Sequence, residues 1–368
     1  MIPFIREIDS RLMNAKEQTE MVYKILILGA SYGSLLATKF AAAGHYVTLV
    51  CREETAALIN SEGTEVRIKL KGEEAHRSFF SNNLAGVVNA VTPENASPQD
   101  YDLVCLAMQE PQYSHPTISN LLGQIAKSKV PCMSIMNMPP LPYLKRIPNF
   151  DTSNLRDAFL DAEIWDQFDP ELVTLCSPDP QAFRPPEEKP NVLFVGLPTN
   201  FKVSKFRDPS HNLILTTLEA DVENYQIDGK DVPVKLRVFD SIFVPFAKWA
   251  MLATGNYRCI TREGPRSIND AVHSDIDKSK EIYDFVNGVV ERLGADPSDM
   301  VPFGKYAAAA KNLLKPSSAA RAVFAGAANI ERVDKVIKLS ADELQMSNPT
   351  ISETIIIVDE SLSNNNMS

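Results

Sequence analysis

Residues 24–52, KILILGASYGSLLATKFAAAGHYVTLVCR, constrain the fold of this chain more than any other stretch. The run at 23–29 is continuously apolar, which is typical of a parallel strand buried on both faces. A helix is predicted from Ser31 to Ala43, and Gly44 supplies its stop. The segment HYVTLVCR then forms a second strand. The whole stretch therefore predicts a β-α-β unit.

The same alternation of strand and helix continues along the first half of the chain. Residues 101–108 and 130–138 predict two more buried strands, with a helix at 113–128 between them. TEVRIKL at 64–70 alternates and predicts a hairpin ending at Gly72. Such alternation implies right-handed crossovers and an open parallel sheet. The predicted fold class is α/β, with an N-terminal Rossmann-type doubly wound sheet.

The second half of the chain changes character after residue 139. Prolines concentrate between 139 and 190, which predicts a loop-rich insertion around one helix at 154–167. The run LILTTL at 213–218 and the run at 232–239 are interpreted as strands. Helical spacing of apolar residues then dominates, with the clearest examples at 240–256, 279–295 and 304–314.

These boundaries predict three parts. The expected parts are an N-terminal extension at 1–20, a dinucleotide-binding domain at 21–205 that contains the 139–190 insertion, and a mostly helical domain at 206–368 that carries substrate and catalytic residues.

Composition limits the partners. The net charge of −10 opposes binding to a phosphate backbone, so no nucleic acid is expected. No apolar run approaches the length of a membrane span, and charges throughout residues 1–20 argue against a signal peptide. The five cysteines form no C-x-x-C pair and favour buried thiols in the cytoplasm. The five histidines show no ligand spacing, so no metal is expected.

The turn after the first predicted strand favours a dinucleotide. A pyrophosphate site needs a tight turn whose free N–H groups meet the phosphates at a helix N-terminus. In Gly29-Ala30-Ser31-Tyr32-Gly33-Ser34 only the first of the three usual glycines is present, with Ser31 and Ser34 at the other two positions. This match leaves open an ordinary β-α-β unit of a flavodoxin-like or hydrolase sheet. We expect all six residues to contact the cofactor.

The end of the second strand bears on which cofactor is bound. NAD sites place an acid there for the ribose 2′-OH, whereas NADP sites place a cation for the 2′-phosphate. This strand ends in Arg52, which favours NADP(H). An arginine that is merely solvated at the end of a strand is an equally common interpretation. The turn also resembles that of short-chain dehydrogenases, but no tyrosine has the lysine four residues later that those enzymes use.

Taken together, the motifs resemble the ketopantoate reductase family, two-domain enzymes similar to 6-phosphogluconate dehydrogenase that reduce a 2-oxo acid with NADPH. GHYVTLVCR resembles the family's second strand with its terminal arginine. YDLVCLAMQEPQ resembles the strand beneath the nicotinamide, with Gln109 where the family usually has lysine and Gln112 on its later glutamine. SIMNM resembles the family's LQNG loop, with Asn137 on the asparagine and Met138 in place of the glycine.

Two further matches lie in the second half, and the resemblance runs from about 24 to 360. FAKWAMLATGN resembles KLAxNxxxN, with Lys248 on the catalytic lysine, Leu252 replacing the first asparagine and Asn256 on the second. KPSSAARAVFAGAANIERVD resembles SSMLQDxxxGRxTEID, with Ser318 on a serine and Glu331 on the glutamate, one residue further apart than usual. The resemblance implies a substrate held by Asn137, Asn256 and Ser318.

The chemistry is consistent with the residues themselves. Reducing a ketone leaves an alkoxide that must be protonated, and a lysine beside the carbonyl can donate that proton. Lys248 lies in an apolar helix, where desolvation would lower its pKa. Lys248, Leu252 and Asn256 are four apart and would share one helical stripe. Each residue also has an interpretation without a role in catalysis. Lys248 would extend to solvent, Asn256 would end a helix, and Glu331 would be a solvated acid.

The sequence thus predicts an NADP-dependent oxidoreductase similar to 2-dehydropantoate 2-reductase, with Lys248 as general acid and Glu331 as its partner. The replacements Leu252 and Met138 favour a different 2-oxo acid or ketone from ketopantoate. An opine-type dehydrogenase using His273 with Asp275 or Asp277, and a non-catalytic NADP sensor, are the alternatives. A homodimer is consistent with the long apolar helices, although core packing explains them equally well.

Overall fold

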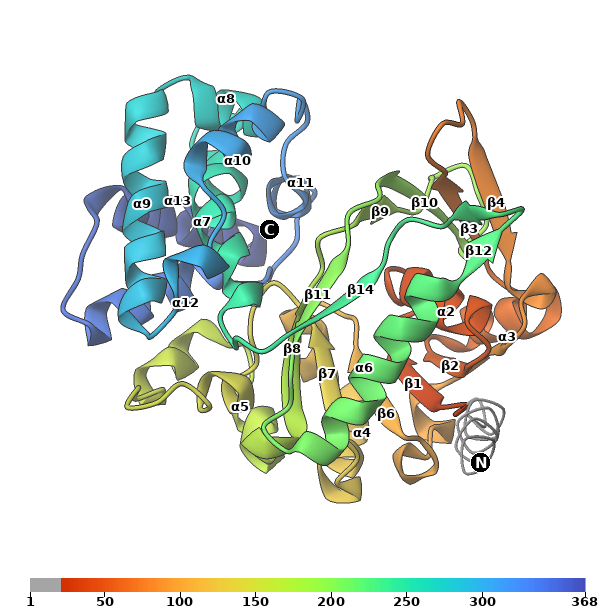
Figure 1. Ribbon diagram of the computed structural model, residues 1–368. Helices are drawn as coiled ribbons and strands as arrows, with labels where there is room; N and C mark the ends of the chain where they lie inside the picture. Colours follow the sequence, from red (N-terminus) through yellow and green to blue (C-terminus); the bar gives the residue numbers. More distant parts are fainter. Residues whose placement is uncertain (1–20, 368) are drawn as a thin grey trace, which may run out of the picture.

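The computed structural model describes residues 21–367, so the predicted extension at 1–20 lies outside the described residues. Its centre is an eight-stranded sheet in the order β14-β11-β8-β7-β6-β1-β2-β5 (Figure 1). Neighbouring strands are parallel except β8 and β11. In this spatial order the strands are Leu236–Phe239, Phe201–Ser204, Val173–Ser177, Cys132–Ile135, Leu103–Leu106, Lys24–Leu28, Tyr46–Val50 and Val87–Val91.

The order of the strands creates a crevice beside β1. From β5 to β8, the strands lie in the order 3-2-1-4-5-6 of their appearance in this sheet, which is the doubly wound arrangement of dinucleotide-binding folds. The order reverses between β1 and β6, so the loops that follow these two strands lead away in opposite directions. The predicted α/β class and the Rossmann-type sheet are confirmed.

Both faces of the central strands are buried, which explains their uninterrupted apolar sequences. Ile25 and Ile27 pack in one cluster with residues of α2 (Gly33–Ala42) and α6 (Pro209–Asn224). Leu26 and Leu28 pack in the other cluster, with α4 (Pro116–Ser128) and residues of the C-terminal helices. Alternate residues of one strand therefore join two different cores.

A second sheet of four strands stands beside the first, in the order β4-β3-β10-β9 (Figure 1). Its strands, in that order, are His76–Phe80, Glu65–Lys69, Val192–Leu197 and Gln181–Phe183. The predicted hairpin supplies β3 and β4, and the Pro-rich insertion supplies β9. Its strand β3 comes directly after α3 (Glu53–Glu62), the helix that follows β2 in the chain.

Two predicted elements are wrong. The run at 213–218 belongs to α6, because Asp208 accepts the Ser210 N–H and Pro209 occupies the first helical position. The helix predicted at 154–167 is two 3-10 helices, η5 (Ser153–Ala158) and η6 (Ala162–Gln167). Between them the Leu160 N–H donates to the Glu110 carboxylate, a tertiary contact that local sequence does not reveal.

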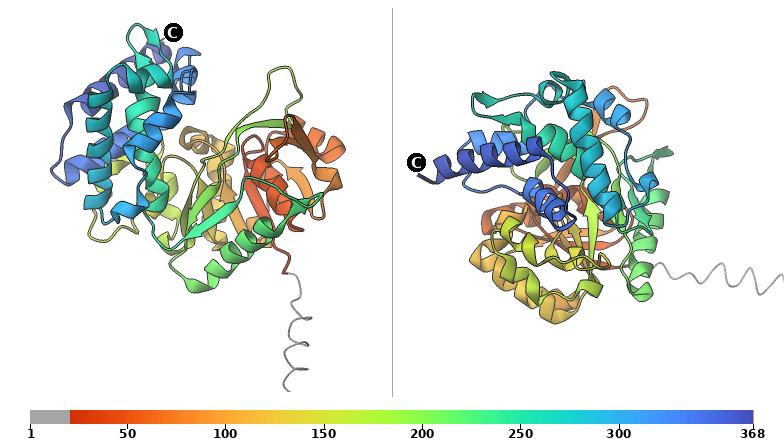
Figure 2. Two further views of the ribbon diagram at one scale, coloured as in Figure 1. Left: turned by 45° about the horizontal axis from the view of Figure 1, so that its top comes forward. Right: turned by 90° about the vertical axis from the view of Figure 1, so that its left-hand side faces the viewer.

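The last part of the described chain is helical and gathers at one end of the sheet (Figures 1 and 2). Because β14 pairs with β11, the main sheet extends beyond residue 205, where the sequence places the start of the helical domain. The helices after it are α7 (Lys248–Met251), α8 (Ile268–His273), α9 (Ile276–Arg292), α10 (Phe303–Ala310), α11 (Ser318–Phe324), α12 (Val333–Glu343) and α13 (Pro349–Met367).

The remaining elements are short. The first half also holds α5 (Leu141–Leu144), and two small hairpins pair β12 (Gln226–Ile227) with β13 (Lys230–Asp231) and β15 (Ile260–Thr261) with β16 (Gly264–Pro265). The other 3-10 helices are η1 (Ser81–Asn83), η2 (Pro93–Asn95), η3 (Pro98–Asp100), η4 (Glu110–Ser114), η7 (Pro170–Leu172), η8 (Val244–Ala247), η10 (Tyr257–Cys259) and η11 (Pro297–Asp299).

Candidate active site

The loop after β1 makes the tight turn that a phosphate site requires. Gly29 has a φ of +102°, and its N–H donates to the Val50 carbonyl at 3.0 Å. A Cβ added to Gly29 would lie 2.8 Å from the Ala107 carbonyl oxygen, which follows β6. A Cβ added to Gly33 would lie 2.7 Å from a methyl of Ile27. Gly29 therefore permits the turn, and Gly33 lets α2 pack closely on β1.

The rest of the turn leaves the N-terminus of α2 open to an anion. No side chain caps the first turn of α2, and it contains no acidic residue. Ala30 is buried, Ser31 is exposed, and the Ser34 hydroxyl donates to the Ser31 carbonyl at 2.8 Å. A helix N-terminus of this kind favours a phosphate. The residues from Gly29 to Ser34 therefore fit the pyrophosphate of a dinucleotide.

Tyr32 has a partner that the sequence does not indicate. Its hydroxyl donates to the Pro180 carbonyl at 2.7 Å, and its ring packs edge-on against Phe201 with centroids 5.8 Å apart. Burial raises the pKa of this phenol. Tyr32 therefore joins the turn to the Pro-rich insertion.

Arg52 stands at the point where the adenosine end of a dinucleotide lies in folds of this order. It directly precedes α3, and its side chain is exposed. Glu53 and Glu54 in the first turn of α3 are also exposed. The position of Arg52 agrees with a site for a ribose or its phosphate. Because the acids Glu53 and Glu54 follow it, the sequence here is compatible with both NAD and NADP.

The helix that carries Lys248 changes type within the predicted stripe. Lys248 begins α7, but Leu252–Asn256 form a π-helix, η9. Its i→i+5 hydrogen bonds shift residues four apart out of line. Leu252 and Asn256 line a cavity, while Lys248 is not among the residues of its wall.

Lys248 instead lies beside Pro178 and Asp179, the two residues that follow β8. Its side chain is 23% exposed, its ammonium donates to the Pro178 carbonyl at 2.7 Å, and the Asp179 carboxylate lies 3.9 Å away. Lys202 shares Asp179 at 3.1 Å. Burial lowers the pKa of Lys248, against the opposite effects of Asp179 and Glu331. A lowered pKa moves the ammonium toward the range in which it donates protons efficiently.

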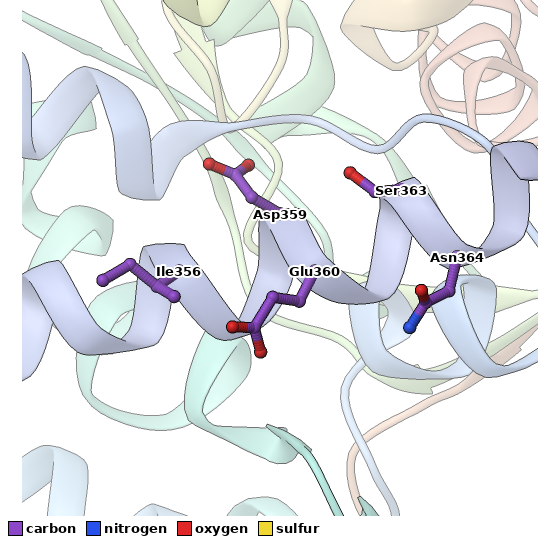
Figure 3. Close-up of a pocket in the computed structure, with 5 residues that line it drawn as sticks. All are labelled: Ile356, Asp359, Glu360, Ser363 and Asn364. Atoms are coloured by element: carbon purple, nitrogen blue, oxygen red, sulfur yellow. The ribbon is translucent and has the colours of Figure 1, made fainter.

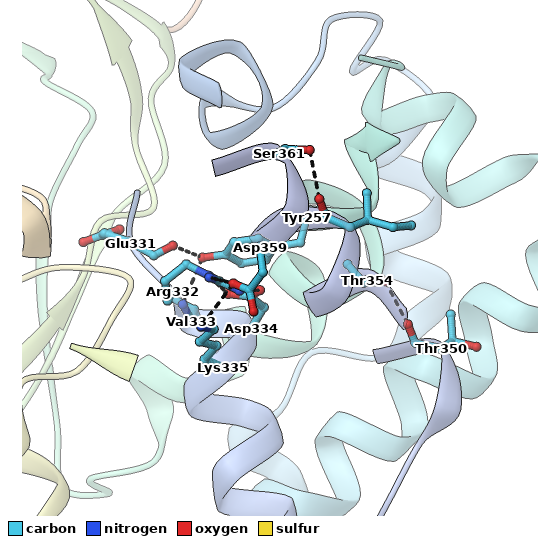
Figure 4. Close-up of polar contacts among 11 residues, drawn as sticks. Tyr257, Glu331, Arg332, Val333, Asp334, Lys335, Thr350, Thr354, Asp359 and Ser361 are labelled. Atoms are coloured by element: carbon cyan, nitrogen blue, oxygen red, sulfur yellow. Dashed lines mark hydrogen bonds and ion pairs between the residues drawn. The ribbon is translucent and has the colours of Figure 1, made fainter. Parts of the chain in front are cut away.

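Glu331 reaches from the helical region toward the sheet (Figure 4). It is 8% exposed, and its carboxylate accepts the Asn137 amide at 3.3 Å and the Glu110 N–H at 3.4 Å. Burial raises the pKa of Glu331 to about 7, although both hydrogen bonds and Lys248 act to lower it. Glu331 thus bonds directly to Asn137 and is near enough to Lys248 for their charges to interact.

The backbone around Glu331 is fixed by buried contacts (Figure 4). The Tyr257 hydroxyl donates to the Glu331 carbonyl at 2.5 Å and accepts the Val333 N–H at 3.0 Å. The next residue, Arg332, forms ion pairs with Asp334 and with Asp359 of α13. The position of the Glu331 carboxylate therefore depends on helices distant in sequence.

Glu110 is a second buried carboxyl, and its sequence context does not single it out. It is 2% exposed and accepts the Leu160 N–H at 3.0 Å. Burial raises the pKa of Glu110 to about 7, and the charge of Glu331 adds to this rise. The only sequence signal is its place between Gln109 and Gln112. Sequence reasoning also missed Asp179 and Tyr257, because each gains its partner only through tertiary packing.

A small cavity is lined by all three predicted substrate residues, Asn137, Asn256 and Ser318. It measures about 40 Å³, below the few hundred Å³ of typical small-molecule sites. The Oδ1 atom of Asn137 is buried with no hydrogen-bond partner, which suits a donor on a bound ligand. The cavity is lined by Gln109, Asn137, Leu252, Asn256, Tyr257, Ser318, Ala319, Ala322, Ile330 and Glu331.

Three predicted residues, Gln109, Gln112 and Asn256, have structural partners as well. The Gln109 N–H donates to the Gln112 side chain at 3.0 Å, and the Gln112 N–H donates back to the Gln109 side chain. Ser317 caps α11, and its hydroxyl donates to the Asn256 carbonyl at 2.7 Å. Ser318 is exposed at the cavity. Gln112 therefore supports the loop, while Gln109 and Ser318 are placed to meet a ligand.

Other features lie away from this cavity. His273 Nε2 is 3.0 Å from the Ala307 carbonyl, and Asp275 caps α9, so neither belongs to the group around Glu331. A shallow hollow along α13 is lined by Ile356, Asp359, Glu360, Ser363 and Asn364 (Figure 3) and contains none of the predicted site residues.

The described part of the chain has neither a cluster of metal ligands nor a helix suited to span a membrane. Residues 21–367 contain no group of three or more histidine, cysteine, aspartate or glutamate side chains arranged to hold a metal ion. Among them, no helix has both the length and the apolar character needed to span a bilayer. The five cysteines are free, and all but Cys51 are buried.

Comparison with known proteins supports the fold. No family model and no curated protein sequence matches the chain. The structure is similar to 2-dehydropantoate 2-reductase from Methylococcus capsulatus, with 16% identity, 94% of this chain and 98% of that chain covered, and a TM-score of 0.63. It is also similar to D-mandelate dehydrogenase with NADH and anilino(oxo)acetate, with 13% identity, coverage of 93% and 99%, and a TM-score of 0.60.

A third similar structure is the dimeric ketopantoate reductase from Staphylococcus aureus, with 10% identity, coverage of 93% and 99%, and a TM-score of 0.58. In each case nearly the whole of both chains is matched, so the likeness includes the sheet and the helical region together. The chain therefore has the two-part fold of the ketopantoate reductases.

Proposed function

We propose that this protein is an NADPH-dependent reductase of a 2-oxo acid or related ketone, similar to 2-dehydropantoate 2-reductase, with Lys248 as general acid. The observation that carries the proposal is the meeting of two parts of the chain at one edge of the sheet. Lys248 and Glu331 come from the helical region, and Asn137 follows β7. The phosphate-type turn at Gly29 follows β1, which β6 separates from β7 in the sheet.

The cofactor would be held by the turn from Gly29 to Ser34, by Arg52, and by Gln109 near the cavity. When bound, NADPH supplies the hydride for the carbonyl carbon. Lys248 polarises the carbonyl oxygen and donates a proton to it as the alkoxide forms. General acid catalysis of this kind contributes about 10²–10⁴ in rate. The lowered pKa of Lys248 favours the transfer.

Glu331 and Asn137 would bind and orient the substrate. With a pKa of about 7, Glu331 is protonated in part at neutral pH and can donate as well as accept a hydrogen bond. The unpartnered Asn137 Oδ1 accepts a hydrogen bond from a ligand hydroxyl or amide. Asn256 and Ser318 provide further polar groups on the cavity wall.

The substrate is proposed to differ from ketopantoate. Leu252 places an apolar side chain on the cavity wall where the family pattern has asparagine. Met138 is fully buried in the core and is not among the residues of this wall, so it acts on packing behind the site. A wall with fewer polar groups favours a 2-oxo acid with an apolar side chain.

The direct test is oxidation of NADPH by the purified protein in the presence of a panel of 2-oxo acids, with ketopantoate and phenylglyoxylate among them. We expect turnover that is higher with an apolar 2-oxo acid than with ketopantoate. A ketopantoate rate typical of a committed biosynthetic enzyme would contradict the substrate proposal. A protein that binds NADPH tightly but turns over nothing on the panel would instead be the non-catalytic NADP sensor.

The remaining expectations belong to the same proposal. We expect the reductase to act in the cytoplasm on small molecules alone, and to form a homodimer. Light scattering of the full chain measures the last point directly. The His273 ring and the Asp275 carboxylate contact backbone groups away from the cavity, so the reductase is the function that we propose over the opine-type alternative.

A further inference from the structure

One segment of the insertion, residues 178–184, runs past Lys248, Tyr32 and Arg52; we call it the strap. Its Pro178 carbonyl accepts the Lys248 ammonium, and its Pro180 carbonyl accepts the Tyr32 hydroxyl. Its last residue, Arg184, is near enough to Cys51 and Arg52 for their charges to influence it. The strap therefore passes the reacting end, the phosphate turn and the adenosine end in the order of a bound dinucleotide.

The second sheet holds Arg184 in this place. Arg184 directly follows β9, which pairs with β10 through Phe183 opposite Phe194. The rings of these two phenylalanines lie 5.2 Å apart. Arg184 is half-buried, whereas Arg52 on the main sheet side is exposed. Two separate sheets therefore bring one arginine each to the carboxyl end of β2.

The charge of Arg52 acts on Arg184, and no carboxylate of the described chain is among the groups whose charges act on Arg184. Burial and the charge of Arg52 both lower the pKa of Arg184, and the nearby Cys51 thiol only partly opposes this. Within residues 21–367, no ion pair or side-chain hydrogen bond involves either guanidinium. Glu53 and Glu54 follow Arg52 in α3 but remain exposed and unpaired with it. Like charges at short range favour the binding of an anion.

We propose that Arg184 and Arg52 together bind the 2′-phosphate of NADPH, and that Arg184 is a specificity-determining residue for this cofactor. This inference rests on the proposed function. A guanidinium donates paired hydrogen bonds to phosphate oxygens, and two of them match the two charges of a phosphate dianion. NADH has a hydroxyl at that position and leaves the two arginines unneutralised. The preference for NADPH thus depends on a residue of the insertion.

The test measures the dissociation constants of NADPH and NADH by fluorescence titration of the full chain. We expect R184A to raise the NADPH constant roughly 10- to 100-fold, as loss of a charge-assisted contact does, and to change the NADH constant by less than about threefold. R184K keeps the charge and should recover part of the affinity. R207A is the matched control, because Arg207 is an exposed arginine paired with Glu171 away from the strap.

The outcomes separate this inference from the proposed function. If R184A keeps the wild-type affinity for NADPH, or loses affinity for NADPH and NADH equally, the role of Arg184 is overturned but the proposed function is not. A wild-type protein that prefers NADH overturns both the NADP assignment and the two-arginine site. A wild-type protein that binds neither nucleotide overturns the proposed function. Thermal unfolding of each variant shows that the fold is retained.

Discussion

The Lys248 ammonium donates a hydrogen bond to the Pro178 carbonyl at 2.7 Å, so the proposed general acid is oriented by the Pro-rich insertion. This backbone oxygen fixes the direction of the ammonium without neutralising its charge. Asp179, the next residue, is 3.9 Å away and is shared with Lys202. The insertion therefore contributes to the proposed active site as well as to the proposed cofactor site.

Replacing Lys248 with methionine should lower kcat by about 10²–10⁴ and leave the NADPH dissociation constant nearly unchanged, because the ammonium acts on the substrate oxygen. Steady-state kinetics and nucleotide titration measure the two effects. K202A is the matched control, since Lys202 pairs with the same Asp179, and it should keep most of its activity. Equal rates for wild type and K248M would disprove the general-acid role.

The raised pKa of Glu331 predicts a specific dependence of stability on pH. Its folded-state pKa is about 7, above the ordinary value of 4.5, so the folded state binds more protons between these values. The contribution of Glu331 to the free energy of unfolding is then fully present below pH 4.5. This contribution falls as the pH rises to 7, by up to about 1.4 kcal/mol per pH unit. Urea unfolding at several pH values should show a smaller slope for E331Q than for wild type.

Gly29→Ala should disrupt both the fold and cofactor binding. The φ of +102° strains any L-residue by about 1–2 kcal/mol, and the new Cβ also meets the Ala107 carbonyl at 2.8 Å. Gly44→Ala is a matched control, because Gly44 has a φ of +95° with no atom near the added Cβ. We expect a larger loss of unfolding free energy for G29A than for G44A. Equal losses would show that the clash is relieved by small shifts.

Tyr257→Phe should reduce turnover by displacing Glu331. The change removes a hydroxyl that contacts the Glu331 carbonyl and the Val333 N–H, at a cost of about 1–3 kcal/mol. Tyr306→Phe removes another buried hydroxyl, which donates to the Met251 carbonyl, and serves as the control. If both variants are destabilised but only Y257F loses kcat, the positioning role holds. A parallel loss of kcat in both would indicate a general structural effect.

Leu252→Asn should shift the substrate preference. An asparagine on this part of the wall adds a partner for a substrate hydroxyl, so kcat/KM for ketopantoate should rise relative to an apolar 2-oxo acid by roughly 10-fold or more. Leu252→Ala enlarges the cavity without adding a polar group and should not change this ratio in the same direction. An unchanged ratio in L252N would place the substrate side chain elsewhere.

Several parts of the fold follow from local sequence. The buried strands of the first half are predictable because their apolar runs are continuous, and the turn at Gly29 because its neighbours are small. The prediction of a strand at 213–218 is wrong, since its β-branched residues also fit a helix that Asp208 and Pro209 begin. The prediction of one helix at 154–167 is wrong because Glu110, some fifty residues earlier, binds the backbone in its middle.

The sequence alone determined which strands are buried, where the phosphate turn lies, and which residues are candidates for chemistry, because these depend on near neighbours along the chain. Only the tertiary structure decided which candidates meet. It left Lys248 off the cavity wall that Leu252 and Asn256 line, bonded Glu331 to the Glu110 backbone, and brought Arg184 within reach of the charge of Arg52. Such contacts arise from the packing of two sheets and a group of helices, and no local pattern encodes them.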